Sequence, residues 1–319
     1  MKSMKIVATV LALCLLCAAL VACQPQPLNN PNESTTGTPQ SPSNGGGADI
    51  GNTPDDSLNA IKLVFDGTKC EIPTGKTDAV TASGNVFTIS KAGTYELSGS
   101  LSDGQIRVEV PKTAEKTNEV FLIFNGFSAY SSTTAPFYVV SADEVTIELK
   151  QGTVSRLEDA DTYQIGAATK PSACLFSSDD LVIRGNGSLF VTGHFKNGIG
   201  CSNDLRIKNG TVKVQAPNNI LKGGDSVTIS GGHVTLSGGE DGIKTDNEEI
   251  GSGKGFVLIS ENAKVDISCS DDAIQATQLI TIESTVSVTG TAGDSALNCD
   301  GAINCADGVV NIVVGGSIQ

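Results

Sequence analysis

The chain repeats itself along its second half, and this repetition limits its fold more than any other feature. In each copy an aliphatic residue is followed by two further short stretches in which apolar and polar residues alternate. The aliphatic markers are Leu175, Ile199, Leu221, Ile243, Ile274 and Leu297, which lie 24, 22, 22, 31 and 23 residues apart. The long interval contains a polar insertion around residues 248–255. One copy therefore measures about 22 residues, a length typical of a single layer in a stacked repeat protein.

Alternation of apolar and polar residues is typical of β-strands with one buried face. Three such strands fill each copy, so no helix fits between them and βαβ units are excluded. Neighbouring copies must then stack and bury a common interior, which predicts an all-β fold built as a parallel β-helix. A β-sandwich is the alternative, but it does not explain why matching residues return at the spacing of the repeat.

The composition agrees with this architecture and narrows the function. With 36 glycines and no tryptophan among 319 residues, we expect many tight turns and small aliphatic residues between them, rather than aromatic clusters or a helical bundle. Lysine and arginine number 21 against 35 aspartates and glutamates, which gives a net charge of -14. Electrostatic attraction to nucleic acid or to anionic lipid is therefore excluded as a function.

The beginning of the chain differs from the rest. Lys2 and Lys5, an apolar run and the ending Leu-Val-Ala-Cys resemble a bacterial lipoprotein signal, with Cys23 as the lipidated residue that anchors the protein in the membrane. An uncleaved membrane anchor is the alternative. The segment that follows is rich in Pro, Asn, Ser and Gly, a composition that cannot form a packed core. We expect a signal peptide at 1–22, a disordered tether at 23–57 and a folded β-strand domain at 58–319, held at the extracellular face of the bacterial membrane.

Polar residues recur at fixed distances from the aliphatic markers. Because stacked strands lie about 4.8 Å apart, such residues form columns along the stack. Two positions before the marker stand Asn197, Asn219, Asp241, Asp272 and Ser295, and one position further back stand Glu240, Asp271 and Asp294. Four positions after it stand Asp179, Asn203, Asp225 and Asn247, with Asp246 beside the last. The stacked asparagines predict a ladder of amide hydrogen bonds.

Carboxylates at this spacing repel one another unless a cation neutralises them. Aspartate and turn carbonyl oxygens suit calcium, which takes about six to eight oxygen ligands. We therefore expect calcium ligands at Asp225, Asp241, Asp246, Asp271 and Asp272. An acidic corner that only keeps the protein soluble is the alternative.

Two lysines, Lys222 and Lys244, occupy the first outward position after the marker in successive copies. A lysine pair on a flat strand face beside carboxylates predicts contacts with the carboxylates or hydroxyls of a sugar. Charges that merely decorate a solvated face are the alternative.

Four segments carry a likeness to a known family: Asp-Gly-Ile-Lys-Thr-Asp-Asn-Glu-Glu at 241–249, Asp-Asp-Ala-Ile-Gln-Ala at 271–276, Ala-Gly-Thr-Tyr-Glu-Leu-Ser-Gly at 92–99, and Gly-Gln-Ile-Arg-Val at 104–108. Together they resemble a secreted bacterial family described as cellulose- and acid-sugar-binding. The likeness runs from about Ile61 to Ile312. It implies a right-handed single-stranded parallel β-helix akin to pectate lyases, with calcium at aspartate-rich turns and carbohydrate binding. The chain departs from the family pattern at Ser295, where another acidic residue is usual.

Six cysteines lie beyond the lipidated one: Cys70, Cys174, Cys201, Cys269, Cys299 and Cys305. The columns place most of these too far apart or out of register for a disulfide, so we expect small inward-facing fillers. A pair between Cys299 and Cys305 stays open.

Three functions remain. The first is a membrane-tethered, monomeric binder of plant cell-wall or acidic polysaccharide, either cellulose or polyuronate, that uses calcium. The second is a calcium-dependent lyase of the pectate type, in which a lysine or arginine acts as base. The third is a structural stalk at the cell surface. We prefer the binder, because Lys222 and Lys244 stand beside carboxylates that keep an ammonium group protonated, and this makes each a poor base.

Overall fold

The computed structural model describes residues 59–164, 166, 170–249 and 251–315, which belong to one compact unit. The expected signal peptide and tether, including Cys23, lie outside the described residues. No helix within the described ranges is long and apolar enough to cross a membrane.

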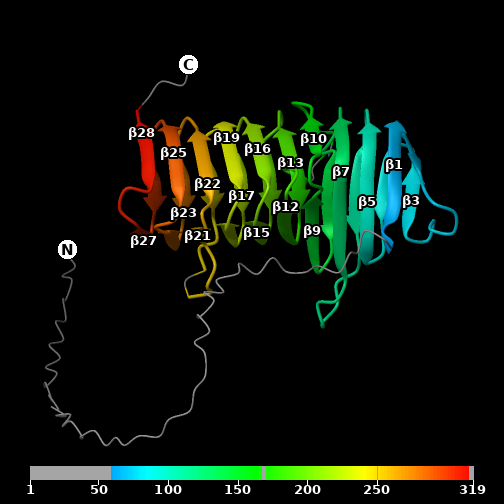
Figure 1. The fold of residues 1–319 in the computed structure, drawn as a ribbon, viewed down its shortest axis with the longest axis horizontal. Helices are drawn as coiled ribbons and strands as arrows, with labels where there is room; N and C mark the ends of the chain where they lie inside the picture. The colour runs from blue at the N-terminus through cyan, green and yellow to red at the C-terminus, as the bar shows by residue number, and fades with distance from the viewer. Residues whose placement is uncertain (1–58, 165, 167–169, 250, 316–319) are drawn as a thin grey trace, which may run out of the picture. The chain divides into compact units, whose positions relative to one another are not determined.

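Twenty-eight β-strands in two sheets make up the described part of the chain (Figure 1). The smaller sheet has ten strands: β3 (Val80–Ser83), β4 (Val86–Ile89), β6 (Gln105–Glu109), β8 (Phe137–Ser141), β11 (Ala173–Ser177), β14 (Asn197–Cys201), β17 (Leu221–Gly223), β20 (Ile243–Thr245), β23 (Ile274–Ala276) and β26 (Leu297–Cys299). From β4 onward its neighbouring strands are parallel.

The larger sheet has 18 strands and divides into two arms. It begins with β1 (Ile61–Gly67), β2 (Lys69–Glu71), β5 (Gly93–Leu101) and β7 (Glu119–Ser131). One arm contains β9 (Glu144–Leu149), β12 (Asp180–Gly185), β15 (Asp204–Ile207), β18 (Ser226–Ile229), β21 (Phe256–Ile259), β24 (Leu279–Ile282) and β27 (Ala302–Cys305). The other contains β10 (Val154–Asp159), β13 (Ser188–Thr192), β16 (Thr211–Ala216), β19 (His233–Gly238), β22 (Lys264–Ser268), β25 (Ser287–Ala292) and β28 (Val310–Val314).

Strand β7 is where the two arms meet. Its first half pairs with β9 from Glu119 to Phe124, and its second half pairs with β10 from Ser128 to Ser131. Gly126 lies between the halves with φ 65°, a left-handed conformation that glycine adopts without strain. The chain therefore passes from one arm to the other within a single strand.

The prediction of an all-β fold is confirmed, but the prediction of a right-handed single-stranded parallel β-helix is wrong. Three short strands per coil would give three separate columns, whereas two of the columns here are arms of one nearly closed, barrel-like sheet. The nine-residue β5 and the 13-residue β7 cause this, because each covers alone what two short strands cover in later layers. The pairs β1–β2 and β3–β4 are also antiparallel.

The predicted register between the repeats is confirmed. Each aliphatic marker pairs with the marker of the next copy: Leu175 with Ile199, Ile199 with Leu221, Leu221 with Ile243, Ile243 with Ile274, and Ile274 with Leu297. The markers from Leu175 to Ile274 are fully buried. The interval of 31 residues is thus a normal layer with an insertion, as the sequence indicates.

The core changes character along the stack. Towards the N-terminal end it contains a cluster of aromatic rings, in which Phe124 lies 5.5 Å from Phe127 and 5.7 Å from Phe137 between ring centroids. Phe65 packs at 5.1 Å against Phe127 and at 5.3 Å against Phe87. The expectation of a core without aromatic clusters is therefore wrong for this end. In the later layers the core is aliphatic, as predicted.

The six described cysteines are unpaired, so the open pair between Cys299 and Cys305 is not formed. Cys174, Cys201 and Cys269 are buried, as expected of inward-facing fillers, but Cys305 is exposed. Burial raises the pKa of the Cys201 thiol to about 12 and that of Cys269 to about 11. These thiols are therefore protonated at neutral pH and act as small apolar side chains.

Candidate functional site

One edge of the ten-stranded sheet collects the polar column that precedes the aliphatic markers. Its members lie at or just before the first residue of successive strands: Asn197, Asn219, Asp241, Asp272 and Ser295. Backbone hydrogen bonds tie the layers together along this edge: the Ile220 N–H donates to the Asp241 carbonyl oxygen at 2.9 Å, and the Gly242 N–H donates to that of Asp272 at 2.9 Å. The edge has an amide half and a carboxylate half.

The amide half is the ladder that the sequence predicts. The backbone N–H of Asn219 and its Nδ2 both donate to Asn197 Oδ1, at 3.1 and 3.0 Å. Asn197 Nδ2 in turn donates to the Ser172 carbonyl oxygen at 3.0 Å. Both asparagines are buried, so these bonds fix their side chains in place.

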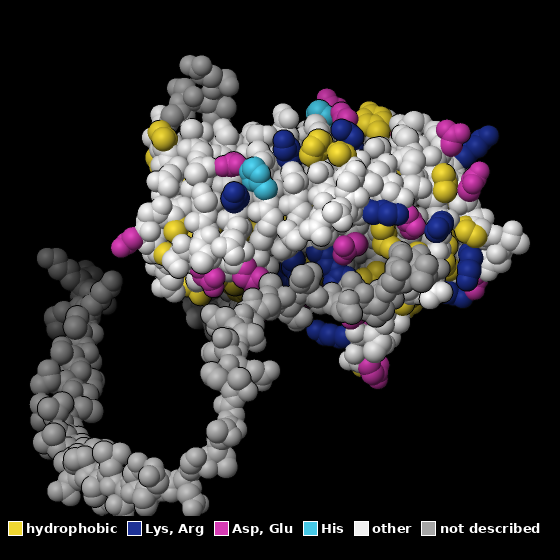
Figure 2. Space-filling view, viewed as in Figure 1, with side chains coloured by type: hydrophobic (Ala, Val, Ile, Leu, Met, Phe, Trp, Pro, Cys, Tyr) yellow, Lys and Arg dark blue, Asp and Glu magenta, His cyan; other side chains and the backbone are white. Residues whose placement is uncertain are grey.

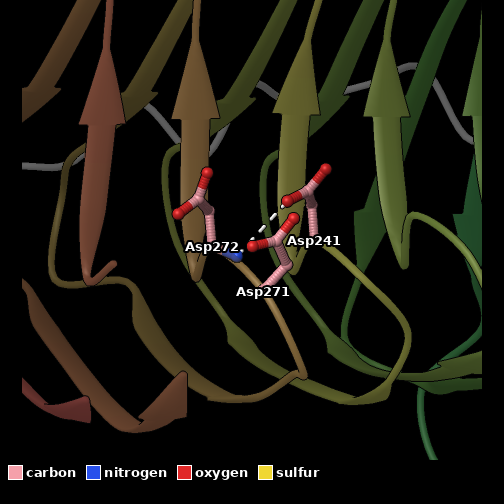
Figure 3. A group of neighbouring side chains, drawn as sticks. All are labelled: Asp241, Asp271 and Asp272. Atoms are coloured by element: carbon pink, nitrogen blue, oxygen red, sulfur yellow. Dashed lines mark hydrogen bonds between the residues drawn. The ribbon is translucent and has the colours of Figure 1, made fainter. Parts of the chain in front are cut away.

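The carboxylate half brings together Asp241, Asp271 and Asp272, each with an oxygen within 4.8 Å of the others. Figure 3 shows the Asp271 carboxylate pointing toward Asp241, with Asp272 beside them. Asp241 and Asp272 are each only 2% exposed, whereas Asp271 is exposed. The cluster is therefore built into the edge of the sheet and open to solvent on the Asp271 side.

Partners exist for some of these oxygens and not for others. Asp241 Oδ2 accepts from Lys244 Nζ at 2.8 Å. Asp272 Oδ2 accepts from Asn298 Nδ2 at 2.6 Å and from Gln275 Nε2 at 3.3 Å. The other oxygen of the buried Asp272, Oδ1, has no hydrogen-bond partner among the described residues. A buried carboxylate oxygen without a donor is costly and is the observation that most favours a bound cation here.

The electrostatics of the cluster point the same way. Partial burial raises the pKa of Asp271, and the neighbouring charges of Asp272, Asp241 and Asp294 raise it further. Like charges are therefore held together at this edge, which a divalent cation would relieve. Three carboxylates with an open side also match the oxygen ligands and retained water that calcium prefers.

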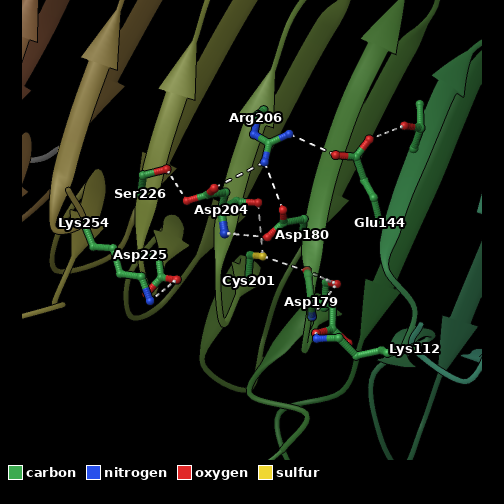
Figure 4. A network of polar contacts seen from close by, with 12 residues as sticks. Lys112, Glu144, Asp179, Asp180, Cys201, Asp204, Arg206, Asp225, Ser226 and Lys254 are labelled. Carbon is green, nitrogen blue, oxygen red and sulfur yellow. Dashed lines mark hydrogen bonds and ion pairs between the residues drawn. The ribbon is translucent and has the colours of Figure 1, made fainter. Parts of the chain in front are cut away.

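Elsewhere the protein neutralises three converging carboxylates with a side chain of its own. In the arm that begins with β9, Arg206 reaches Glu144 at 2.9 Å, Asp180 at 3.0 Å and Asp204 at 3.2 Å (Figure 4). Burial and the nearby Asp204 raise the pKa of Asp180 despite the arginine. At the edge of the smaller sheet, the basic side chain that forms an ion pair with the cluster of Asp241, Asp271 and Asp272 is Lys244. Among the described residues this lysine pairs with Asp241 only.

Two of the five predicted calcium ligands do not join the cluster. Asp246 forms an ion pair with Lys222, with Oδ2 2.6 Å from Nζ. Asp225 accepts from Asn247 Nδ2 at 2.8 Å and lies 3.1 Å from Lys254 Nζ (Figure 4). Both carboxylates are thus already neutralised by lysines.

The predicted lysine pair lies in one outward column of the smaller sheet. Lys222 on β17 pairs in register with Lys244 on β20. The same column continues in both directions: Tyr138, Phe176, Gly200, Lys222, Lys244, Gln275 and Asn298. Reasoning from the sequence did not identify Gln275 and Asn298 as contacts of Asp272, although the register places them directly after Lys244.

Basic and acidic side chains lie beside one another on the surface. In Figure 2 acidic side chains gather at the lower left of the visible face, with basic ones next to them. Such juxtaposition suits a ligand that carries both carboxylates and hydroxyls, because cations and oxygen acceptors are both within reach.

Comparisons with known proteins agree with a role in carbohydrate recognition. Residues 83–316 match the model of a family described as carbohydrate-binding domain-containing protein. A protein of that description from Acetivibrio thermocellus is 39% identical over 249 residues, which are 77% of this chain and 84% of the relative. A solved structure, a polysaccharide lyase-like protein from C. thermocellum in a gadolinium derivative, superimposes with a TM-score of 0.74 at 38% identity and covers 79% of this chain and 99% of the other.

Proposed function

Because the chain belongs to the carbohydrate-binding domain-containing protein family, we propose that it binds polysaccharide along the polar edge and outward column of the ten-stranded sheet, with a calcium ion at Asp241, Asp271 and Asp272. The unpartnered, buried Asp272 Oδ1 within a group of three close carboxylates is the observation that carries the calcium part. Lys222 and Lys244 are the proposed sugar contacts, since both lie in the column next to this group.

Calcium explains how an acidic protein can bind an acidic polymer. The chain carries a net charge of -14, so it repels a polyuronate at long range. A divalent ion coordinated by the three aspartates keeps open positions toward Asp271, the exposed side of the cluster. Carboxylates or hydroxyls of the sugar take those positions.

Binding to polygalacturonate, measured by calorimetry in calcium and then in excess chelator, tests the proposal. We expect saturable binding in calcium and its loss in chelator. Asp272→Asn should lose the binding even in calcium, whereas Asp307→Asn, at an exposed aspartate of the last layer, should retain it. Undiminished binding in chelator would remove calcium from the proposed function.

A polysaccharide lyase is the second candidate, because the related structure is described as polysaccharide lyase-like. Lyase chemistry needs an unprotonated base beside the cation. Lys244 is the nearest lysine, but its Nζ lies 2.8 Å from a carboxylate oxygen of the buried Asp241, so this ion pair already engages its ammonium group. Incubation with polygalacturonate and calcium, followed by ultraviolet detection of unsaturated products, distinguishes lyase from binder. We expect no product.

We also propose that the protein is a lipoprotein at the outer surface of the cell membrane, anchored through Cys23. The proposal rests on the sequence before and at this cysteine. Metabolic labelling with a fatty acid should mark the wild type and not Cys23→Ala, and the variant should leave the membrane fraction. Equal labelling of both proteins would exclude this anchor.

A further inference from the structure

Two hollows lie over the amide half of the polar edge. The first has a volume of about 450 Å³ and is lined by Phe195, Lys196, Asn219 and the turn before β17. The second has a volume of about 240 Å³ and lies over Gly200, next to Lys170 and Phe176. Ser172, Asn197 and Lys222 line both, so the two hollows adjoin along the edge of the sheet.

Three lysines converge on these hollows in a protein that is acidic overall. Lys196 is exposed in the turn after β13 and lines the first hollow. Lys170 lines the second, where its ammonium group donates to Ser202 Oγ at 2.7 Å. Lys222 stands between the two, with its side chain 29% exposed. This concentration of positive charge fits an anionic ligand.

Aromatic rings provide fixed apolar walls. The Phe195 ring stacks on Tyr163 with centroids 4.1 Å apart and an interplanar angle of 19°. Tyr163 is buried, and its hydroxyl donates to the buried Asp159 and to the Ala173 carbonyl oxygen. Phe195 is therefore held from behind while its exposed part faces the first hollow. Phe176 lines the second hollow; it is buried and packs against Tyr138 with ring centroids 5.8 Å apart. Flat apolar walls beside polar groups suit a sugar ring.

An unpartnered acceptor also lines the first hollow. Asn219 is 6% exposed, and its Oδ1 has no hydrogen-bond partner among the described residues. Its Nδ2 is already bonded to Asn197 and Asn218. The oxygen lies just beneath the surface of the hollow, so a sugar hydroxyl becomes its donor only when the Asn219 side chain or the turn before β17 shifts.

Asp246 forms an ion pair with Lys222, whose ammonium group lies between the two hollows. Its carboxylate is 2.6 Å from Lys222 Nζ, and its side chain is 50% exposed. An exposed partner of this kind contributes little stability and is easily exchanged. It holds the position that the carboxylate of a ligand needs.

We propose that the adjoining hollows form a subsite for a carboxylated sugar, in which Lys196 and Lys222 bind the carboxylate and Asp246 is the internal counter-ion that the ligand replaces. The subsite deepens the proposed function and rests on it, because the same polymer continues along the edge to the three aspartates. It is distinct from the calcium position, since its contacts to the ligand are direct ion pairs.

Calorimetric titration of the purified protein with oligogalacturonate in saturating calcium tests this subsite. Each of Lys196→Gln and Lys222→Gln should weaken binding about tenfold, because each removes one hydrogen bond to a charged group. Lys213→Gln removes the same charge from β16 on the other sheet and should leave affinity within about twofold. Asp246→Asn should tighten binding, since the ligand no longer competes with it.

The outcomes separate the subsite from the proposed function. If the wild type binds but Lys196→Gln and Lys222→Gln bind equally well, the subsite is wrong and Lys222 is not a sugar contact, whereas calcium-dependent polysaccharide binding at the three aspartates stands. If Asp246→Asn weakens binding, this aspartate is not a displaced counter-ion. If the wild type binds no oligogalacturonate in calcium, the proposed function and the subsite both fail. Calcium affinity, measured in parallel, should be unchanged in the two lysine variants.

Discussion

The two ends of the stack differ in the length of their strands and in the residues that fill their core. From β1 to β9 the layers are irregular, with the nine-residue β5 and the 13-residue β7 among shorter strands, and aromatic rings such as Phe124 and Phe127 fill the interior. From β14 onward the strands have three to six residues, and the interior is aliphatic. The irregular end has no repeated polar column, whereas the regular end places Asn219, Asp241 and Asp272 in line.

This difference separates stability from recognition. Long strands and large rings bury much apolar area in each layer, which stabilises the end of the stack that begins the domain. Short, equal layers bury less but repeat their turns, so one side-chain type can be stacked along an edge. We infer that the irregular end stabilises the fold and the regular end binds ligand.

Phe124→Ala tests the stabilising role of the irregular end and should have the largest effect. Removing this fully buried ring should lower the free energy of unfolding by about 3–5 kcal/mol, measured by urea denaturation. Ile243→Val, in the regular core, should cost about 0.5–1.5 kcal/mol. Polysaccharide affinity of folded Phe124→Ala should equal that of the wild type. If Phe124→Ala bound polysaccharide more weakly than the wild type at a low temperature where it stays folded, the irregular end would also contribute to binding.

Calcium should stabilise the regular end selectively. At a concentration of about 100 times its dissociation constant, a ligand adds about 2.7 kcal/mol to the stability of the state that binds it. Hydrogen exchange should therefore slow in β20 and β23 on addition of calcium, and remain unchanged in β5. Asp272→Asn should show no such response. If calcium still slowed hydrogen exchange in Asp272→Asn, and did so equally in β5 and in β20, the ion would bind away from the three aspartates.

Arg206 connects the two regions, because it joins Glu144 on β9 to Asp180 and Asp204 in the following layers (Figure 4). Arg206→Gln should lower the free energy of unfolding by about 1–3 kcal/mol, since three partly buried carboxylates lose their charged partner. Arg184→Gln is a matched control with a single carboxylate partner, Glu148, and should cost at most about 1 kcal/mol. Equal losses would show that the network adds nothing beyond single pairs.

The pH dependence of the regular end should give the smallest effect. Hydrogen bonds from Thr289 and then His233 lower the pKa of Asp266. Because its pKa is lower in the folded than in the unfolded state, the stabilisation is present above the unfolded value of about 3.9 and is lost as pH falls through the folded pKa. Thr289→Val should flatten this acid-side loss in thermal melts. An unchanged slope would exclude the hydrogen bond as its cause.

The sequence predicts the regular end well because its aliphatic markers recur about every 22 residues, and this spacing sets which strands stack on one another. The pairing of Leu221 with Ile243, and even of Ile243 with Ile274 across the insertion, follows from the spacing alone. The long strands β5 and β7 do not belong to the 22-residue repeat. Only their pairing over the whole length shows that each joins two columns of strands. For that reason the predicted fold class failed while the predicted register held.

The candidate site divides in the same way. Asp241 and Asp272 share a column and Asp271 stands in the column beside it, so stacking predicts that they meet. Asp225 and Asp246 are at comparable positions, but each reaches a lysine, and Lys254 stands in the insertion, where no column fixes it. Lys196 lies in a turn outside the repeated columns, so its place beside Lys222 does not follow from the repeat.

Calorimetric titration of calcium into the protein without polysaccharide tests the central claim most directly. The account predicts saturable binding that Asp241→Asn and Asp272→Asn both lose and that Asp307→Asn retains. Calcium binding of equal affinity in all four proteins, or none in the wild type, would contradict an ion site at the edge of the ten-stranded sheet.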